Sequence, residues 1–477
     1  MKTPFLGGAY MSRSANLANQ RCINLYPELV ETKDGKAVGG FYSVPGETLL
    51  ASVGTGPHRG SRARPGGLLY VVSGSGLYSV AASTWASTLL GNLGTSTGPV
   101  CIIDNGTQIA VFDGVAGYCW TGTAFVAISL PATGPVSANY QDGFGLVNQL
   151  GTQTWWQSNY KDLTTWNALN FGTKDAKPDW VVAIGDKNRE VWLFGQEYTE
   201  VWVNAGVSGF TFQRLQGVFL QAGCCATFSV ANIEESLIWL GSNEYGQGVV
   251  LVSEGYRAKR VSTHAIEYAI KGYVAAGLTI SDAIGYVYQD AGHTFYVLTF
   301  PSANVTWTWD MVTGLWHERA AFVNGAFNRH DGNSYAFYGG RHVIGDWQSS
   351  NLYALDLEVY TDNGRPRKWL RSWRALPPNK ASTEPVTFDS LQLDLETGMT
   401  VPAGTNPQIA LRWSDDGGNS WSNEHLEAWG VTGATANRVK WRRLGQTRES
   451  TGLDRTFEIS SSDPVRAALI GADMEAQ

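Results

Sequence analysis

A serine between two glycines is the first feature of this sequence with residue types suited to chemistry. Residues 94–98 read G-T-S-T-G, which matches the nucleophile-elbow pattern G-x-S-x-G of hydrolases. An elbow holds its serine on a sharp turn between a strand and a helix. Here Pro99 and the strand-like run V-C-I-I follow, so no helix would position Ser96. We therefore interpret this segment as a loop and predict no catalytic serine.

Histidines, cysteines and carboxylates could also catalyse reactions or bind metals, and they are scattered along the chain. The seven histidines form neither H-E-x-x-H nor H-x-H, and the five cysteines form no C-x-x-C. Because metal sites need clustered ligands, we predict no metal and no cofactor. The odd, low number of cysteines also argues against a disulfide framework. Two carboxylates from distant segments could still meet in space as a catalytic pair, and the sequence leaves that open.

A turn motif follows at residues 414–421, which read S-D-D-G-G-N-S-W. It matches an Asp-box at Ser414, Asp416, Gly418, Ser420 and Trp421. The aspartate of such a turn accepts hydrogen bonds from backbone N–H groups, and the glycine adopts positive φ. The motif resembles the Asp-boxes of sialidases, which stabilise hairpins away from the active site. A sialidase repeats the box across its propeller, whereas this chain has it once, so we predict a structural turn.

A basic, aromatic segment at residues 365–374 reads R-P-R-K-W-L-R-S-W-R. On a strand, alternate residues would share one face, namely Arg365, Arg367, Trp369, Arg371 and Trp373. One interpretation is nucleic-acid contact through charge and stacking. We favour the other, a strand pinned by stacked Arg–Trp pairs at a domain or subunit interface. The basic run at 438–443 repeats the pattern and adds Arg442 and Arg443 as interface candidates.

Short strands rich in aromatic and β-branched residues, separated by Gly- or Asn-containing turns, must position these side chains. Seven such runs, which we expect to be inner strands, begin near Leu68, Gln108, Phe144, Val191, Leu237, Thr294 and Ser334. Their spacing of roughly 35–60 residues indicates a repeat architecture, and the alternation indicates antiparallel hairpins. We predict an all-β chain with a propeller of six or seven blades. One helix is expected inside it, capped by Thr263, stopped at Gly272 and stabilised by a Glu267–Lys271 pair.

Changes in composition suggest the domain organisation. Residues 1–50 are expected to be an irregular lead-in that joins the propeller, and residues 51–362 the propeller itself. Residues 363–380 would be a boundary segment, broken at L-P-P-N (376–379). Four alternating strands within residues 381–477 predict a β-sandwich.

Charge and hydropathy exclude some classes of protein. The chain carries 35 basic and 42 acidic residues, a net charge of −7, whereas tight nucleic-acid binders are usually basic. Passive contact with DNA stays open. Because the sequence has no apolar run of ~18 residues and no signal peptide before Pro4, we expect no membrane insertion and synthesis in the cytoplasm.

Six segments occur in a particular order along the chain. They are R-C-I-N-L-Y-P-E (21–28), Y-S-V-P-G (42–46), S-T-H-A-I-E (262–267), R-P-R-K-W-L-R-S-W (365–373), L-R-W-S-D-D-G-G-N-S-W (411–421) and W-R-R-L-G to F-E-I-S-S-S-D-P-V (441–465). Together they resemble the phage stabilisation family, the packaged-DNA stabilisation or tail-nozzle proteins of short-tailed phages.

That resemblance implies a structural virion protein of the tail that is not an enzyme. It implies a ring, usually a hexamer, below the head-to-tail adaptor protein. The ring would extend the DNA channel, retain packaged DNA and anchor the tail needle or plug and the tailspikes or fibres. Double-stranded DNA would pass without sequence specificity, and an acidic channel wall would repel its phosphates. The resemblance assigns no individual residue a role.

Two other functions compete with this one. A propeller tail protein that binds or hydrolyses glycans would need a central pocket with paired carboxylates or an arginine cluster at the blade ends. A DNA-binding protein would need affinity that falls steeply with salt. An assembly protein would instead show reciprocal side faces in a head-to-tail ring.

Overall fold

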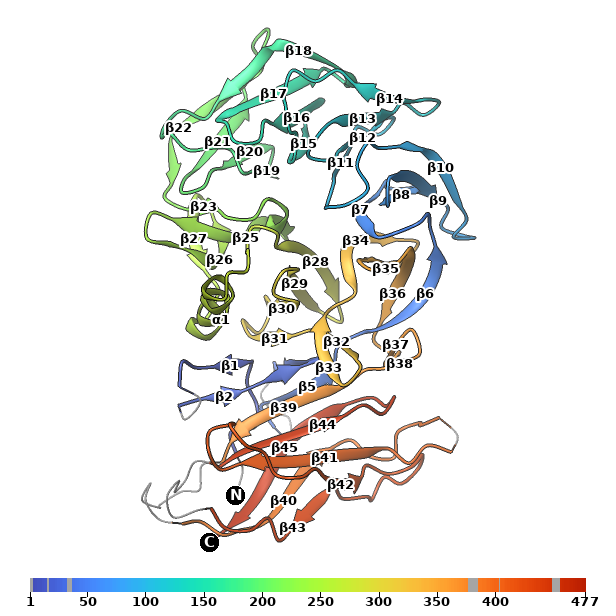
Figure 1. The fold of residues 1–477 in the computed structure, drawn as a ribbon, viewed down its shortest axis with the longest axis vertical. Helices are drawn as coiled ribbons and strands as arrows, with labels where there is room; N and C mark the ends of the chain where they lie inside the picture. The colour runs from blue at the N-terminus through green and yellow to red at the C-terminus, as the bar shows by residue number, and fades with distance from the viewer. Residues whose placement is uncertain (1–2, 15–16, 32–36, 376–384, 403, 448–454) are drawn as a thin grey trace.

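The computed structural model describes residues 3–14, 17–31, 37–375, 385–402, 404–447 and 455–477. Seven antiparallel sheets surround a central channel, and a β-sandwich lies beside two of them (Figure 1). The predicted all-β class is confirmed, and the expected six or seven blades are seven.

The first four blades are four-stranded sheets whose strands follow one another along the chain. Blade 1 contains β7 (His58–Ala63), β8 (Leu69–Ser73), β9 (Gly76–Val80) and β10 (Ser87–Asn92). Blade 2 contains β11 (Cys101–Asp104), β12 (Ile109–Phe112), β13 (Gly117–Trp120) and β14 (Phe125–Ile128). Blade 3 contains β15 (Ala138–Gln141), β16 (Phe144–Asn148), β17 (Thr154–Asn159) and β18 (Asp162–Thr173). Blade 4 contains β19 (Ala183–Lys187), β20 (Glu190–Phe194), β21 (Thr199–Asn204) and β22 (Phe212–Leu220).

The last three blades carry additions. Blade 5 contains β23 (Gly223–Cys224), β24 (Ala231–Ile233), β25 (Ser236–Asn243), β26 (Gly246–Glu254) and β27 (Arg257–Arg260), with the 3-10 turn η1 (Thr227–Ser229) before β24. Blade 6 contains β28 (Ile284–Asp290), β29 (His293–Phe300), β30 (Val305–Asp310) and β31 (Trp316–Glu318). Blade 7 contains β34 (Gly332–Tyr338), β35 (Arg341–Asp346), β36 (Asn351–Asp356) and, as its outer strand, β6 (Gly46–Ser52). A segment near the N-terminus therefore closes the ring.

The channel is lined by the innermost strand of every blade, which is the first strand along the chain in every blade but blade 5, where it is β24. These strands contact one another in the order β7, β11, β15, β19, β24, β28 and β34, and β34 returns to β7. The expectation for the inner strands is therefore wrong in six blades, where the strand next to the innermost one is formed by the runs near Leu68, Gln108, Phe144, Val191, Leu237 and Thr294. Second strands are covered by blades on both faces, so they carry the longest apolar runs. Inner strands face the channel and are less apolar.

The predicted helix is α1 (His264–Ala275), which leads from blade 5 to blade 6. Its cap is confirmed, because the Thr263 side chain accepts a hydrogen bond from the backbone N–H of Ile266. The predicted stop at Gly272 is wrong, since the helix continues to Ala275 and Gly277 adopts the positive φ. Glu267 pairs with Arg260, at 2.6 Å, rather than with Lys271.

The sandwich takes strands from both ends of the chain. Its first sheet continues blade 6 in the order β28, β29, β30, β31, β3, β39, β44, β41, β42, nine strands in all. The strands beyond β31 are β3 (Cys22–Ile23), β39 (Trp369–Arg374), β44 (Thr456–Ser461), β41 (Gln408–Ser414) and β42 (His425–Ala428). The facing sheet contains β4 (Leu25–Leu29), β5 (Gly39–Ser43), β45 (Ala468–Ala476), β40 (Phe388–Leu395) and β43 (Lys440–Arg442). Strand pairing therefore continues without a break from propeller to sandwich.

Short elements complete the connection. They are the hairpins β1 (Tyr10–Met11) with β2 (Asn19–Gln20) and β32 (Ala320–Val323) with β33 (Ala326–Arg329), and the pair β37 (Thr361–Asp362) with β38 (Arg365–Pro366). Within the segment expected to be an irregular lead-in, β4 and β5 belong to the facing sheet, β3 pairs with both β31 of blade 6 and β39 of the sandwich, and β6 joins blade 7. The break expected at 376–379 lies outside the described residues.

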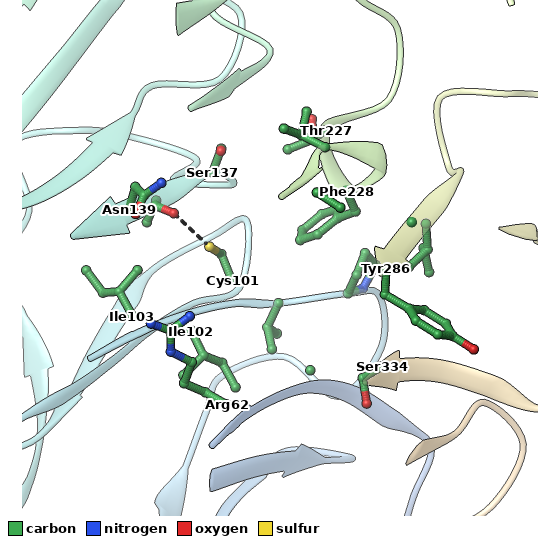
Figure 2. A pocket seen from close by; sticks show the side chains of 18 of the residues that line it. Arg62, Cys101, Ile102, Ile103, Ser137, Asn139, Thr227, Phe228, Tyr286 and Ser334 are labelled. Atoms are coloured by element: carbon green, nitrogen blue, oxygen red, sulfur yellow. Dashed lines mark hydrogen bonds between the residues drawn. The ribbon is translucent and has the colours of Figure 1, made fainter. Parts of the chain in front are cut away.

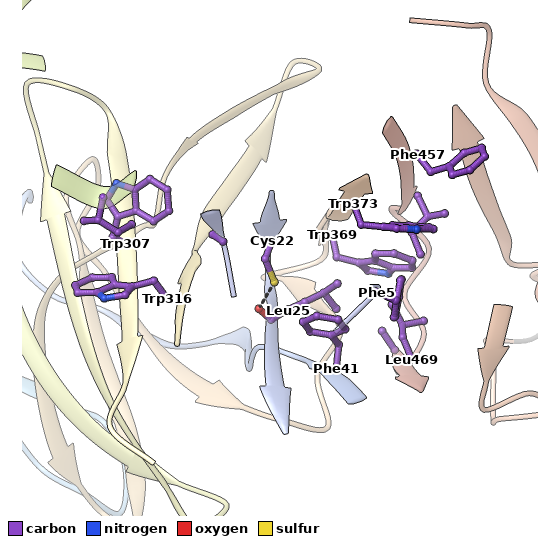
Figure 3. Close-up of a cluster of buried hydrophobic side chains, with 14 of the residues drawn as sticks. Phe5, Cys22, Leu25, Phe41, Trp307, Trp316, Trp369, Trp373, Phe457 and Leu469 are labelled. Carbon is purple, nitrogen blue, oxygen red and sulfur yellow. Dashed lines mark hydrogen bonds between the residues drawn. The ribbon is translucent and has the colours of Figure 1, made fainter. Parts of the chain in front are cut away.

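One hydrophobic core runs through the junction. Figure 3 shows Trp307 and Trp316 of blade 6 on one side and Phe457 and Leu469 of the sandwich on the other, with Phe41 between them. Burial of apolar area contributes roughly 25 cal/mol per Å². Because propeller and sandwich share this buried cluster, we expect them to move as one body.

Candidate functional site

The central channel is the first candidate site, because binding and catalytic sites of propellers can form there. It encloses a cavity of about 500 Å³ lined by residues of all seven inner strands, and Figure 2 labels ten of the lining residues. The only carboxylate among the lining residues is Asp186, which accepts a hydrogen bond from Asn139 Nδ2 at 2.8 Å. The cavity wall thus lacks the carboxylate pair that glycoside hydrolysis requires.

Cys101 is the one thiol in the wall of this cavity. Its Sγ donates to the backbone oxygen of Ala138 at 3.1 Å. Burial raises the pKa of the Cys101 thiol, so it stays protonated and is a poor nucleophile at neutral pH.

The G-T-S-T-G segment near this cavity is a loop, as predicted. Arg59 holds it in place by donating to the backbone oxygens of Thr95, Thr97 and Gly98 at 2.8, 2.8 and 2.6 Å. The segment is thus a fixed connection between blades.

The Asp-box residues form a turn between β41 and β42. The carboxylate of Asp416 accepts hydrogen bonds from the Ser414 hydroxyl at 2.7 Å and the Ser420 backbone N–H at 2.8 Å. Trp421 Nε1 donates to the backbone oxygen of Gly418, where φ is 97°. Hydrogen bonds from Ser420, followed by that from Ser414, lower the pKa of Asp416. Every one of these bonds is internal to the turn, and such bonding is what a purely structural role requires.

The basic, aromatic segment is divided between two places, so the expectation that all five alternate residues share one strand face is not met. Trp369, Arg371 and Trp373 alternate along β39 and are buried. Arg365 belongs to β38, and Arg367 lies between the two strands. The division arises because β38 ends at Pro366 and β39 begins only at Trp369, so that the two residues between them interrupt the strand alternation.

Arg371 joins the N-terminal segment to the sandwich. Its guanidinium donates twice to the backbone oxygen of Phe5, at 3.0 and 2.7 Å, and contacts the oxygens of Gly8 and Arg21 at 3.3 Å. The stacking partner of Arg371 is the Phe41 ring, at 4.9 Å, rather than the tryptophan we expected. Burial lowers the pKa of Arg371 to about 10. The tryptophans pack on other rings, Trp373 on Phe5 and Trp369 on Trp429.

Arg365 and Arg367 join a buried ionic cluster where β6 closes the ring. The members of this closure cluster are Glu47, Arg319, Asp331, Asp362, Arg365 and Arg367. Arg365 is paired with Asp331, and Arg319 donates to the backbone oxygen of Pro45 at 3.0 Å. Burial raises the pKa of Asp362 to about 6, and burial with the nearby carboxylates raises that of Glu47. Arg442 and Arg443, by contrast, are exposed on the sandwich.

His293 forms a third junction that the sequence did not reveal. Its Nδ1 lies 2.9 Å from Asp310 Oδ2, and its Nε2 lies 2.8 Å from Glu28 Oε2. Burial acts to lower the pKa of His293, but the hydrogen bonds and charges of Asp310 and Glu28 outweigh it and raise the pKa to about 9. An imidazolium therefore links β4 to blade 6. Glu28 and His293 are 265 positions apart, so no sequence motif could have signalled the contact.

Among the described residues, no group of three or more His, Cys, Asp or Glu side chains is arranged to hold a metal ion. No helix within the described ranges is long and apolar enough to cross a membrane.

Two family models match nearly the entire sequence. The one described as bacteriophage P22 Gp10, beta-propeller, matches residues 1–360, and the one described as bacteriophage P22 Gp10, beta-sandwich, matches residues 368–477. The chain belongs to the bacteriophage P22 Gp10 family. The resemblance to the phage stabilisation family is thereby confirmed, and this Gp10 family member is a structural protein of a phage tail.

Other comparisons add no closer relationship for the Gp10 family member. No curated protein sequence matches it. Among solved structures, the extracellular domain of a one-component system from B. thetaiotaomicron aligns with a TM-score of 0.43 and 9% identity, over 86% of this chain and 58% of that one. A chain of the mitotic checkpoint complex aligns with a TM-score of 0.44 and 10% identity, over 66% of this chain and 96% of that one.

Proposed function

We propose that this protein forms the tail nozzle, a ring of identical subunits, most simply a homohexamer, below the head-to-tail adaptor protein. The ring extends the DNA channel, retains packaged DNA and anchors the tail needle and the tailspikes or fibres. The chain is made in the host cytoplasm and acts in the virion, where double-stranded DNA passes without sequence-specific contact.

The observation that carries this proposal is the unbroken nine-stranded sheet, in a chain of the Gp10 family. A sheet that continues from blade 6 into the sandwich resists bending between the two parts, because bending would break backbone hydrogen bonds. A subunit that holds back packaged DNA must transmit force without hinging. The propeller, whose own channel encloses a cavity of only about 500 Å³, then forms part of the wall of a larger ring.

Arg442 and Arg443 fit this proposal as subunit contacts. Both are exposed on the sandwich surface, and neither side chain forms an ion pair with another residue that the structure describes. Trp369, Arg371 and Trp373 are buried inside the subunit, so we assign them to the interface between the N-terminal segment and the sandwich.

Mass photometry of the purified protein, alone and with purified adaptor rings, tests the proposal. We expect a discrete complex with several copies of this chain per adaptor ring, and rings in negative-stain images of that complex. In infected cells, a stop codon early in the gene should give filled heads that lose their DNA. A chain that stays monomeric beside the adaptor, or that hydrolyses a glycan, would overturn the proposal.

A further inference from the structure

A second cavity opens at the mouth of the channel, above the turn that joins β28 to β29. Its volume is about 860 Å³, within the range of roughly 300–1,000 Å³ that is usual for ligand sites. Blade 5 contributes Glu234, blade 6 contributes Tyr288 and Asp290, and blade 7 contributes Tyr335, Phe337 and His342. The lining residues include two carboxylates and no lysine or arginine. We call this cavity the mouth pocket.

One wall of the mouth pocket is a rigid stack of rings from blades 6 and 7. Tyr335 stacks on Tyr286, with centroids 5.3 Å apart and planes 10° apart. On its other side the Tyr335 hydroxyl lies 2.9 Å from His342 Nδ1. Phe337 packs against His342 at 5.2 Å and leaves 58% of its surface exposed. The wall therefore presents aromatic surface that its neighbours hold in place.

Asp290 faces this wall without a partner. It is half-buried, and in the part of the chain that the structure describes its side chain makes no hydrogen bond or ion pair. The titratable side chains that interact electrostatically with the Asp290 carboxylate are Tyr26, Tyr288, Tyr335 and His342. All four are neutral near pH 7, because burial raises the pKa of each tyrosine and lowers that of His342.

The cationic side chains near Asp290 already have other hydrogen-bond or ion-pair partners. His293 lies between Glu28 and Asp310, at 2.8 and 2.9 Å. Arg319 donates to the Tyr288 hydroxyl and to the backbone oxygen of Pro45. Glu234, the second carboxylate of the pocket, accepts only a neutral hydrogen bond from Thr294, at 3.3 Å. The pocket thus has an uncompensated negative charge beside exposed aromatic surface.

We propose that the mouth pocket binds an arginine side chain presented by a protein partner. A guanidinium stacks on aromatic rings and pairs with a carboxylate through two parallel hydrogen bonds. Phe337 and His342 supply the stacking surface, and Asp290 supplies the carboxylate, with Glu234 placed to accept a neighbouring polar or cationic group. The cavity is larger than one side chain needs, so the segment that bears the arginine also enters it. The proposal does not depend on ring assembly, since every residue of the pocket belongs to one subunit.

The test uses the purified full chain and N-acetyl-L-arginine methylamide as the probe, in calorimetric titrations at low ionic strength. We expect saturable binding in the millimolar range, and no binding of the matched citrulline compound, which has the same shape without the charge. Asp290→Asn should weaken binding about tenfold or more, and Phe337→Ala several-fold. Asp290→Glu should retain most of the affinity.

Two exposed residues on other surfaces provide matched controls. Asp473→Asn on β45 and Tyr245→Ala in blade 5 should leave binding unchanged, and circular dichroism should show that every variant is folded. The proposal is overturned if the citrulline compound binds equally well or if Asp290→Asn has no effect. Tighter binding of spermidine would assign the pocket to free polyamines instead, and tighter binding of mono- or oligosaccharides would assign it to glycans.

Discussion

The imidazolium of His293 should make the junction between β4 and blade 6 sensitive to pH. Its pKa rises from 6.5 to about 9 in the folded chain. Each pKa unit is worth about 1.4 kcal/mol, so the rise corresponds to about 3 kcal/mol of stability. Because the folded-state pKa is the higher one, this stability is fully present below pH 6.5 and is lost as the pH rises through 9.

His293→Gln removes the titrating group while keeping a polar side chain. Unfolding entropy of about 2.1 cal/mol/K per residue, over 477 residues, makes 1 kcal/mol equivalent to roughly 1 °C in Tm. The gap in Tm between wild type and variant should therefore be about 3 °C larger at pH 6 than at pH 9.5. Differential scanning calorimetry measures this gap, and the subtraction cancels all groups that titrate equally in both proteins.

Histidine-selective ¹³C NMR supplies the direct measurement. One imidazole signal should titrate near pH 9 in the wild type and be missing from the variant. His264→Gln is the control, because His264 is exposed at the start of α1 and the signal near pH 9 should persist in that variant. A His293 signal that titrates at or below its ordinary value of 6.5, or a Tm gap that does not change with pH, would refute the reasoning.

Three further predictions concern the sandwich. Arg371→Met should destabilise the chain by about 3 kcal/mol, because it leaves the carbonyl groups that the guanidinium binds without a hydrogen-bond donor. Chymotrypsin should then cleave the N-terminal segment faster. The control Arg443→Met, on the surface, should cost no more than about 0.5 kcal/mol. Asp416→Ala should open the Asp-box turn, and proteolysis between β41 and β42 should then be faster. Unchanged cleavage would show that the hydrogen bonds of Asp416 do not hold the turn. A fragment of residues 368–477 should be unfolded by circular dichroism and should fold when a peptide of residues 3–45 is added, whereas independent folding would show that β3 to β5 are dispensable.

The propeller could be predicted because its second strands have a strong local signal. Runs such as V-W-L-F in β20 are buried on both faces, and their repetition indicates blades without reference to distant residues. The inner strands were assigned wrongly because they line the channel. β11 was recognised as strand-like, but only one of its four residues is fully buried, so its apolar signal is weaker than that of the second strand beside it.

The junctions could not be predicted, because each one joins segments that are far apart in the sequence. Arg371 contacts Phe5 across 366 positions, and nothing near either residue indicates the other. Strand alternation correctly grouped Trp369, Arg371 and Trp373, since it depends only on backbone geometry. It failed for Arg365 and Arg367, because both precede β39 and their side chains belong to the closure cluster.

The facing sheet of the sandwich also has a consequence for how the chain is made. β5 pairs with β45, so that Phe41 lies opposite Leu469. At 5–20 residues per second, a ribosome takes roughly 20–90 s to travel from one to the other. Throughout that interval one edge of β5 is unpaired, and an unpaired strand edge can pair with other nascent chains. A subunit released before β45 is complete cannot join β5 to β40 in the facing sheet, so we expect such incomplete chains to be excluded from assembly.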